Sequence, residues 1–229
     1  MSKRIVIESN FNTFGFSPHR LTRPWLENRI QIFREFTLKS LLVQTNQDFM
    51  AIFKVVPETE KMINEILAKY PRLPKNIMFV THQEGMERIK TYAGSCENLY
   101  LVRMESDDMY HKSYIQQLHD HRPKPGTLAL INQNGYAYDS IHGEMVPMFR
   151  KSPPYYVFLY KTSEFTSGYR IKLPGRATHG NVIELPHEIL TPRNFVEVIH
   201  RYNSIPRTLP VRGRLSKEEQ KKVLKEFMG

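Results

Sequence analysis

Short apolar segments alternate with helical patterns along the first 120 residues, and this alternation constrains the fold more than any other feature. Strands separated by helices of this length predict right-handed βαβ units and a largely parallel sheet. The strand candidates, which are apolar and rich in β-branched residues, are residues 4–8, 49–56, 77–80 and 98–104. The helix candidates, with apolar side chains at three- and four-residue intervals, are residues 25–42, 58–69, 82–92 and 113–119.

The sequence changes after Pro125 and Gly126, where strand-like segments follow one another without helical patterns between them. Proline and glycine residues break any helix in this region. We therefore expect an α/β fold in which a mostly parallel central sheet is flanked by helices and followed by a loop-rich, mixed or antiparallel C-terminal half. The strand candidates of this half are residues 127–131, 135–139 and 155–160.

Two further helices are predicted near the end of the chain. Thr191 has the properties of an N-cap and Pro192 suits the first helical position, which predicts a helix that continues to about Tyr202. A basic, proline-containing linker follows, and Ser216 then opens a capping box that predicts a short terminal helix. The expected units are one domain over residues 1–204 and a linker with a C-terminal helix over residues 205–229.

The chain has 33 lysines and arginines against 23 acidic residues, a net charge of +10, and half of this excess lies after residue 200. The body is therefore only mildly basic and has no nucleic-acid-binding motif, so we do not expect a nucleic acid as partner. The apolar runs are shorter than the roughly 18 residues that span a bilayer, and the N-terminus lacks the apolar segment of a signal peptide. With the single cysteine, Cys96, these features indicate a cytoplasmic protein.

Three acidic residues, Glu105, Asp107 and Asp108, follow the strand candidate at residues 98–104, in the segment LYLVRMESDDMYHKSY. Ligands of parallel sheets bind beyond the carboxyl ends of the strands, which is where this cluster is expected to lie. Carboxylates separated by one residue can hold a Mn or Mg ion whose remaining ligands are water and phosphate oxygens. Such an ion would stabilise a diphosphate leaving group as a Lewis acid. The competing interpretation is a solvated turn.

Four segments together carry a family pattern: RIQIFREFTLKSLLVQTNQDF at residues 29–49, RMESDDMYH at 103–111, SPPYY at 152–156 and HGNV at 179–182. In this order they resemble GT-A glycosyltransferases of the family-two type, most closely the bacterial family called putative rhamnosyltransferases. The resemblance covers roughly residues 20–200 and implies a GT-A-like, Rossmann-like fold. It also implies metal-dependent transfer of a sugar from a nucleotide-sugar to a hydroxyl acceptor, with residues 1–122 binding the nucleotide and 123–204 facing the acceptor.

The resemblance and the chemistry of the side chains together nominate the site residues. Asp107 is the first candidate metal ligand, Asp108 is a second ligand and catalytic group, and the resemblance adds His179 from a glycine-flanked loop. An inverting transfer needs a carboxylate base, for which the second half of the chain offers Asp139, Glu144, Glu164 and Glu184, and Glu164 is the first choice. The candidates for nucleotide-sugar contacts are Asn10, Phe11, Arg103, Glu105, Arg170 and Arg176.

Two positions depart from the family pattern. Glu105 stands where aspartate is more usual in the family, and the strand that ends at Val56 lacks the aspartate that the superfamily often places near the nucleoside. The sequence therefore does not specify the base or the sugar of the donor.

Two other functions are compatible with the sequence. A sugar nucleotidyltransferase would share the sheet and the acidic ligands, but residues 10–15 do not form a glycine-rich phosphate loop. A non-catalytic glycan- or nucleic-acid-binding module would use the basic surface instead.

The expected partners are a nucleotide-sugar donor and a glycan or lipid-linked acceptor. The basic C-terminal segment has three interpretations: a helix that docks on the body or on a second copy, a peripheral contact at the inner face of a membrane, or a contact with an acidic glycan.

Overall fold

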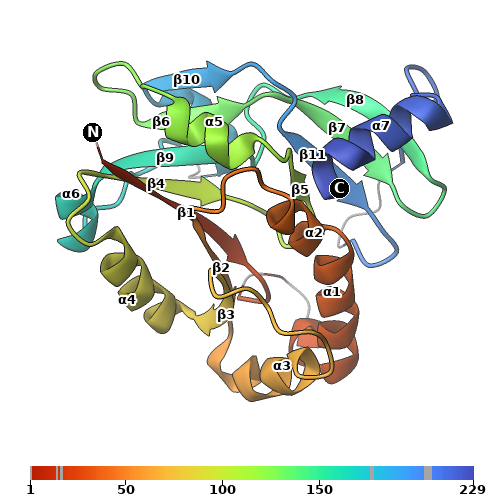
Figure 1. The fold of residues 1–229 in the computed structure, drawn as a ribbon, viewed down its shortest axis with the longest axis horizontal. Helices are drawn as coiled ribbons and strands as arrows, with labels where there is room; N and C mark the ends of the chain where they lie inside the picture. Colours follow the sequence, from red (N-terminus) through yellow and green to blue (C-terminus); the bar gives the residue numbers. More distant parts are fainter. Residues whose placement is uncertain (1, 14, 16–17, 176–177, 204–207) are drawn as a thin grey trace.

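Two β-sheets organise the chain in the computed structural model, which describes all residues except 1, 14, 16–17, 176–177 and 204–207 (Figure 1). The large sheet has seven strands in the order β10-β6-β9-β4-β1-β2-β3, and the small sheet has four in the order β5-β11-β7-β8. The large sheet consists of β1 (Lys3–Asn10), β2 (Met50–Val55), β3 (Ile77–Thr81), β4 (Asn98–Arg103), β6 (Ala129–Asn132), β9 (Tyr156–Lys161) and β10 (His187–Leu190). The small sheet consists of β5 (Met109–Tyr110), β7 (Asn134–Asp139), β8 (Glu144–Phe149) and β11 (Phe195–Ile199).

The large sheet is mostly parallel, which confirms the predicted fold class. β1 pairs in parallel with β2 and β4, and β3 adds a further parallel strand beyond β2. β9 runs antiparallel to both of its neighbours, β4 and β6, while β10 is again parallel to β6. The carboxyl ends of β1, β2, β3, β4 and β6 therefore lie at one side of the sheet, which we call the carboxyl edge.

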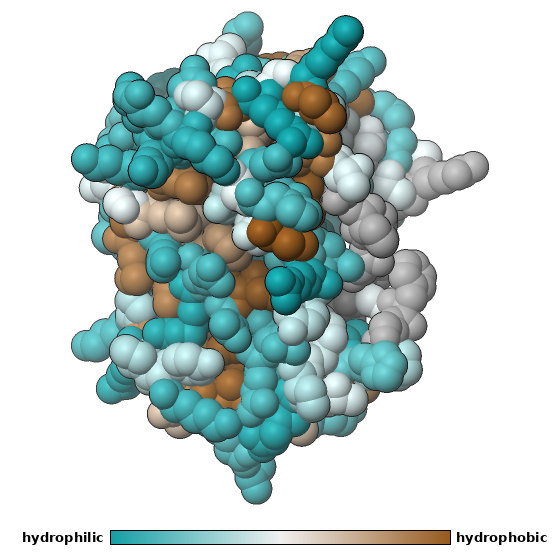
Figure 2. All heavy atoms as spheres, turned by 90° about the vertical axis from the view of Figure 1, so that its right-hand side faces the viewer, coloured by the Kyte–Doolittle hydropathy of each residue, from teal (hydrophilic) through white to brown (hydrophobic). Residues whose placement is uncertain are grey.

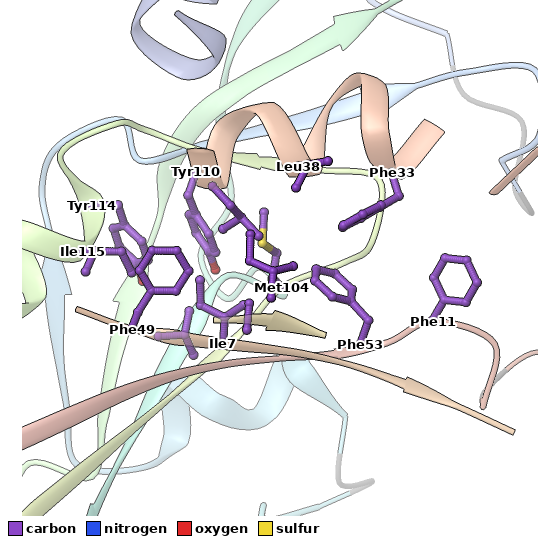
Figure 3. Packing of buried hydrophobic residues seen from close by; sticks show 14 of the residues in the cluster. Ile7, Phe11, Phe33, Leu38, Phe49, Phe53, Met104, Tyr110, Tyr114 and Ile115 are labelled. Carbon is purple, nitrogen blue, oxygen red and sulfur yellow. The ribbon is translucent and has the colours of Figure 1, made fainter. Parts of the chain in front are cut away.

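Helices cover both faces of the large sheet, because successive side chains of its strands point to opposite sides. The helices are α1 (Arg23–Glu35), α2 (Thr37–Leu42), α3 (Glu60–Leu67), α4 (His82–Ala93), α5 (Tyr114–Asp120), α6 (Thr162–Thr166) and α7 (Lys217–Met228), with 3-10 turns η1 (Pro18–Leu21), η2 (Pro57–Thr59) and η3 (His179–Glu184). Ile5 and Ile7 of β1 belong to the core cluster that also contains residues of α1 and α3 (Figure 3). Val6 packs on the other face, with Ile89 of α4 and Phe165 of α6.

The helix predicted over residues 25–42 is divided into α1 and α2, which meet at Phe36. The hydroxyl of Thr37, the first residue of α2, donates a hydrogen bond of 2.8 Å to the carbonyl of Asp108. The start of α2 is thereby attached to the acidic segment that follows β4.

The helix predicted from residue 191 to about 202 is wrong, because Phe195–Ile199 forms strand β11. This strand lies parallel to β7 and antiparallel to β5, and each of its residues is buried. The β-branched residues Val196, Val198 and Ile199 suit a strand that is covered on both faces. That tertiary preference outweighs the local N-cap signal at Thr191. Strands β8 and β10 also lie outside the predicted elements.

The capping box predicted at the start of α7 is confirmed, since Ser216 and Glu219 each accept the backbone N–H of the other. Phe227 of α7 is 1% exposed and packs in a cluster with Ile32 of α1 and Val196 of β11. The C-terminal helix is thus docked on the body, which is the first of the three interpretations of the basic C-terminal segment. Hydrophilic side chains cover most of the face shown in Figure 2, which is the right-hand side of the view in Figure 1. Among the described residues, no helix is long and apolar enough to cross a membrane.

Candidate active site

The acidic loop, residues 104–108, connects β4 to β5 at the carboxyl edge of the large sheet. The Met104 N–H donates to the Glu8 carbonyl at 3.3 Å, so the loop continues the β1–β4 ladder before it turns. Asp107 and Asp108 are only 8% and 5% exposed. Carboxylates are rarely buried without partners that compensate the loss of water, so a solvated turn does not describe this loop.

Asp107 is held by two side chains that are distant in the sequence. Arg29 of α1 donates from Nη1 to Asp107 Oδ2 at 2.9 Å and from Nε to Ser106 Oγ at 3.1 Å. His200, directly after β11, places Nε2 at 3.0 Å from the same Asp107 oxygen. Burial alone would raise the pKa of Asp107, but Arg29 and His200 outweigh it and lower the pKa to about 2. Asp107 is therefore a buried carboxylate that is ionised at neutral pH.

Asp108 is bonded entirely to the protein framework. Its Oδ1 accepts the Val198 N–H of β11 at 2.9 Å, and its Oδ2 accepts the Tyr155 hydroxyl at 2.7 Å. Burial, and then the neighbouring Asp107 carboxylate, raise the pKa of Asp108 well above its usual range. Asp108 thus fixes the acidic loop against β11 and against the residue that precedes β9.

A cavity of about 280 Å³ opens beside Asp107, and we call it the acidic-loop cavity. At its wall, Glu105 forms an ion pair of 2.6 Å with Arg103, and Glu197 of β11 forms one of 2.9 Å with Arg150. Carboxylates and guanidinium groups therefore occur together around one space. Guanidinium groups bind phosphate oxygens well, and carboxylates can bind hydroxyl groups or metal ions. The cavity suits a ligand that contains both phosphates and hydroxyls.

The structure brings four of the predicted site residues to the acidic-loop cavity: Glu105, Asp107, Asp108 and His179. Arg103 lines a neighbouring cavity of about 270 Å³ and reaches the first cavity through its ion pair with Glu105. The role of each of these residues stays a prediction. The structure shows only that the acidic triplet and His179 line the same cavity.

Two other candidates for nucleotide-sugar contacts, Arg170 and Phe11, lie outside the acidic-loop cavity. Arg170 lines the neighbouring cavity, where its guanidinium lies 3.8 Å from the centre of the Phe165 ring. Phe11 is 3% exposed and packs in the core beside Phe79, with ring centroids 4.8 Å apart (Figure 3). Its ring therefore has no face available for a nucleoside. Asn10 is half-buried at the end of β1, and Arg176 lies outside the described residues.

The predicted base, Glu164, does not lie with the acidic loop. It belongs to α6 and lines a third cavity together with Lys3 and Asn98, the first residues of β1 and β4. That cavity is at the amino end of the parallel strands, opposite the carboxyl edge. Glu164 is therefore far from Asp107 in the topology of the sheet.

Four site residues escaped the sequence interpretation: Arg29, Arg150, Glu197 and His200. Glu197 and His200 fall within the segment predicted as a helix, and its assignment as a strand would have placed His200 at a strand end near the acidic loop. Arg29 stands 78 positions before Asp107, and no local pattern indicates that pairing.

Hard oxygen donors for a Mn or Mg ion are present at the cavity. Among the described residues, no group of three His, Cys, Asp or Glu side chains could hold a metal ion by itself. Glu105 and Asp107 nevertheless line the same cavity, and Mg commonly uses one or two carboxylates together with phosphate and water oxygens. The ionised Asp107 and its neighbour Glu105 therefore fit an ion shared with a diphosphate.

Comparisons with known proteins bear on the family and the fold. A family model described as "Putative rhamnosyl transferase" matches residues 18–193. The structure of S. aureus TarS 1-349 in complex with UDP-GlcNAc is similar over 98% of this chain and 70% of that chain, with a TM-score of 0.51 and 12% identity. This likeness shows a shared GT-A fold.

A cytidylyltransferase from Leptospira borgpetersenii is similar over 85% of this chain and 77% of that chain, with a TM-score of 0.39 and 13% identity. A search of the curated proteins gives no match.

Proposed function

The chain belongs to the "Putative rhamnosyl transferase" family, and on this basis we propose that it transfers a sugar from a nucleotide-sugar to a hydroxyl group of a glycan or lipid-linked acceptor. Family membership and the GT-A fold support glycosyl transfer. The observation that carries the proposal is the buried, ionised Asp107, which lies in one cavity with Glu105 and Arg29.

Cationic side chains support a diphosphate-containing donor. Arg29 and Arg150 both line the acidic-loop cavity, and guanidinium groups bind phosphate oxygens through paired hydrogen bonds. The TarS structure contains UDP-GlcNAc, which supports a nucleotide-sugar as the donor class. The family name favours a rhamnosyl group as the transferred sugar.

A divalent ion, Mn or Mg, is part of the proposal. Asp107 and Glu105 would hold it; His179 lines the same cavity, and His200 contacts Asp107. When bound, the ion would supply Lewis-acid stabilisation to the departing diphosphate. Arg29 and His200 prepare Asp107 for this role, because they keep its carboxylate ionised in a buried position.

We assign the catalytic base to Glu197 rather than to Glu164. The Glu197 side chain is 7% exposed at the wall of the acidic-loop cavity, whereas Glu164 lines a cavity at the other edge of the sheet. In an inverting transfer, the Glu197 carboxylate takes the proton of the acceptor hydroxyl as its oxygen bonds to the anomeric carbon. The bond from that carbon to the nucleoside diphosphate breaks in the same step, and the diphosphate leaves.

Thermal unfolding with a panel of nucleoside diphosphates and nucleotide-sugars, with and without Mn²⁺ or Mg²⁺, tests donor binding. A ligand present at 100 times its Kd should stabilise the protein by about 2.7 kcal/mol. We expect stabilisation that depends on the metal and is lost in Asp107→Asn. The matched control is Asp120→Asn, which removes one exposed carboxylate outside the cavity. A panel without any stabilising nucleotide, or equal responses of both variants, would contradict the proposal.

A further inference from the structure

The outer side of β3, the last strand at one end of the large sheet, is a surface that the proposed function does not use. β3 pairs with β2 on one side, and a groove of about 650 Å³ runs along its other side. Phe79 of β3 packs in the cluster that includes α3, and Val80 packs in the cluster that includes α4. The faces of β3 are therefore covered, while its edge is open between the two helices. Open strand edges are sites of pairing with another chain.

The backbone of β3 offers hydrogen-bonding groups to this groove. The Ala51 N–H donates to the Asn76 carbonyl at 2.7 Å, which sets the phase of the β2–β3 ladder. The backbone N–H and carbonyl groups of alternate residues point to opposite sides of a strand. Those of Met78 and Val80 therefore point to β2, and those of Phe79 point to the groove. The N–H and the carbonyl of Phe79 are thus both directed to an incoming strand.

Charges are separated along the groove. Arg72 and Lys75 lie at its end before β3, and Glu60 and Glu84 lie at its other end, in the first turns of α3 and α4. Within the described part of the chain, Arg72, Lys75 and Glu60 form no ion pair. Glu84 pairs with Arg88, which also lines the groove, so Glu60 supplies the net negative charge of that end. One end of the groove is therefore positive and the other end negative.

We propose that a second copy of this chain occupies the groove, with the two β3 strands paired antiparallel about a two-fold axis at Phe79. The axis places the positive end of each groove on the negative end of the other, so that Lys75 of one copy meets Glu60 of the second copy at two equivalent positions. A parallel arrangement would instead bring like charges together. The large sheet continues through both copies, with α3 beside α3 and α4 beside α4.

Charge exchange across the axis tests this dimer by analytical ultracentrifugation. Lys75→Glu places two glutamates opposite each other, and Glu60→Lys places two lysines opposite each other, so each variant should raise the dimer Kd by about tenfold or more. An equimolar mixture of the two variants restores opposite charges at both positions. We expect the mixture to form heterodimers with a Kd within about threefold of the wild-type value.

Lys61→Glu is the matched control, because Lys61 is exposed on α3 outside the groove and undergoes the same charge change. It should leave the dimer Kd unchanged. Circular dichroism of each variant verifies that the fold is retained. A wild-type chain that is monomeric at about 100 μM, which corresponds to less than about 6 kcal/mol of association, would overturn the proposal. Failure of the mixture to restore association, or equal dissociation of Lys61→Glu, would also overturn it.

Discussion

Two adjacent carboxylates, Asp107 and Asp108, are shifted in opposite directions by their surroundings. Arg29 and His200 lower the pKa of Asp107 to about 2 in spite of its burial. Asp108 has only neutral donors, and burial together with Asp107 raises its pKa. The two residues therefore have different surroundings: Asp108 connects the acidic loop to the framework, and the ionised Asp107 is the one to which the proposed function assigns ligand binding.

The pH dependence of stability tests the assignment of Asp108. Because its pKa is raised in the folded state, the stability that it contributes is complete below its unfolded pKa and is lost as the pH rises through its folded pKa. Asp108→Asn can keep both contacts, with its oxygen accepting the Val198 N–H and its amide donating to Tyr155. We expect the free energy of unfolding of this variant, relative to wild type, to increase above about pH 4 in urea titrations.

Asp108→Ala removes both contacts and should destabilise the protein by about 2–4 kcal/mol, since a buried donor left unpaired costs about 1–3 kcal/mol. The control Asp120→Asn, which removes an exposed carboxylate, should change the free energy of unfolding at pH 7 by less than about 0.5 kcal/mol. A flat difference between Asp108→Asn and wild type from pH 4 to 8 would contradict a raised pKa.

Glu197→Gln tests the assignment of the catalytic base. The substitution removes the proton acceptor while it keeps the size of the side chain, so kcat should fall by about 10²–10⁴-fold. Binding of the donor, measured by calorimetry, should change far less than kcat, although the substitution also removes the ion pair of Glu197 with Arg150. Glu164→Gln is the matched control and should retain activity. If Glu164→Gln loses activity and Glu197→Gln does not, the base is Glu164.

The sequence predicted the acidic part of the site but not the residues that set its electrostatics. Glu105, Asp107 and Asp108 are adjacent in the chain and follow a recognisable strand, so their location could be inferred. Arg29 and His200 approach Asp107 only through packing of α1 and β11, and such long-range pairing leaves no periodic signal in a single sequence.

At the scale of elements, Gly135 connects the packing of β7 to the site. A Cβ atom at this position would lie 2.5 Å from ring atoms of Phe195. The Phe195 ring stacks on Tyr155 with centroids 3.9 Å apart, and Tyr155 donates to Asp108. A displacement of Phe195 is thus transmitted to the acidic loop.

Gly135→Ala should therefore destabilise the protein by about 1–3 kcal/mol, the usual range for overpacking, and should also weaken donor binding. Gly180→Ala is the control for stability, because its Cβ would meet only Thr178 Oγ1 at 3.5 Å. Urea unfolding and calorimetry measure the two effects. Equal stability of Gly135→Ala and Gly180→Ala would show that the contact to Phe195 is not rigid.

Element prediction succeeded where hydrophobic periodicity and turn residues agreed, as in β1 to β4 and in α7. It failed at β11, where Thr191 and Pro192 indicate a helix start while Val196, Val198 and Ile199 favour a strand. Pairing with β7 and β5 decides this conflict, and neither strand is near β11 in sequence. The same error concealed Glu197 and His200.

The lysines of α7 decide what form a membrane contact, one of the three sequence-based interpretations of this segment, would take. Val223, Leu224 and Phe227 are engaged with the body, whereas Lys221, Lys222 and Lys225 are exposed. Contact with an anionic membrane would therefore be electrostatic, at about 1 kcal/mol per lysine, and not by insertion of the helix. We expect cosedimentation with phosphatidylserine vesicles that disappears at 0.5 M salt and is weakened by Lys221→Glu and Lys222→Glu. Salt-insensitive binding would contradict this mode.

At the scale of the whole molecule, the site lies where the two sheets meet. The large sheet supplies the acidic loop after β4, the small sheet supplies Glu197 and His200 through β11, and α1 supplies Arg29. Neither sheet contains all of the site residues, so the proposed activity depends on how the two sheets and α1 pack together.

Release of nucleoside diphosphate tests the central claim most directly. The chain is incubated with a panel of nucleotide-sugars and Mn²⁺ or Mg²⁺, and the released diphosphate is quantified for wild type, Asp107→Asn and Asp120→Asn. We predict metal-dependent release from at least one donor and a loss of about 10²-fold or more in Asp107→Asn, with Asp120→Asn unaffected. Absence of release from every donor, or equal rates in Asp107→Asn and wild type, would contradict a nucleotide-sugar glycosyltransferase with its site at the acidic loop.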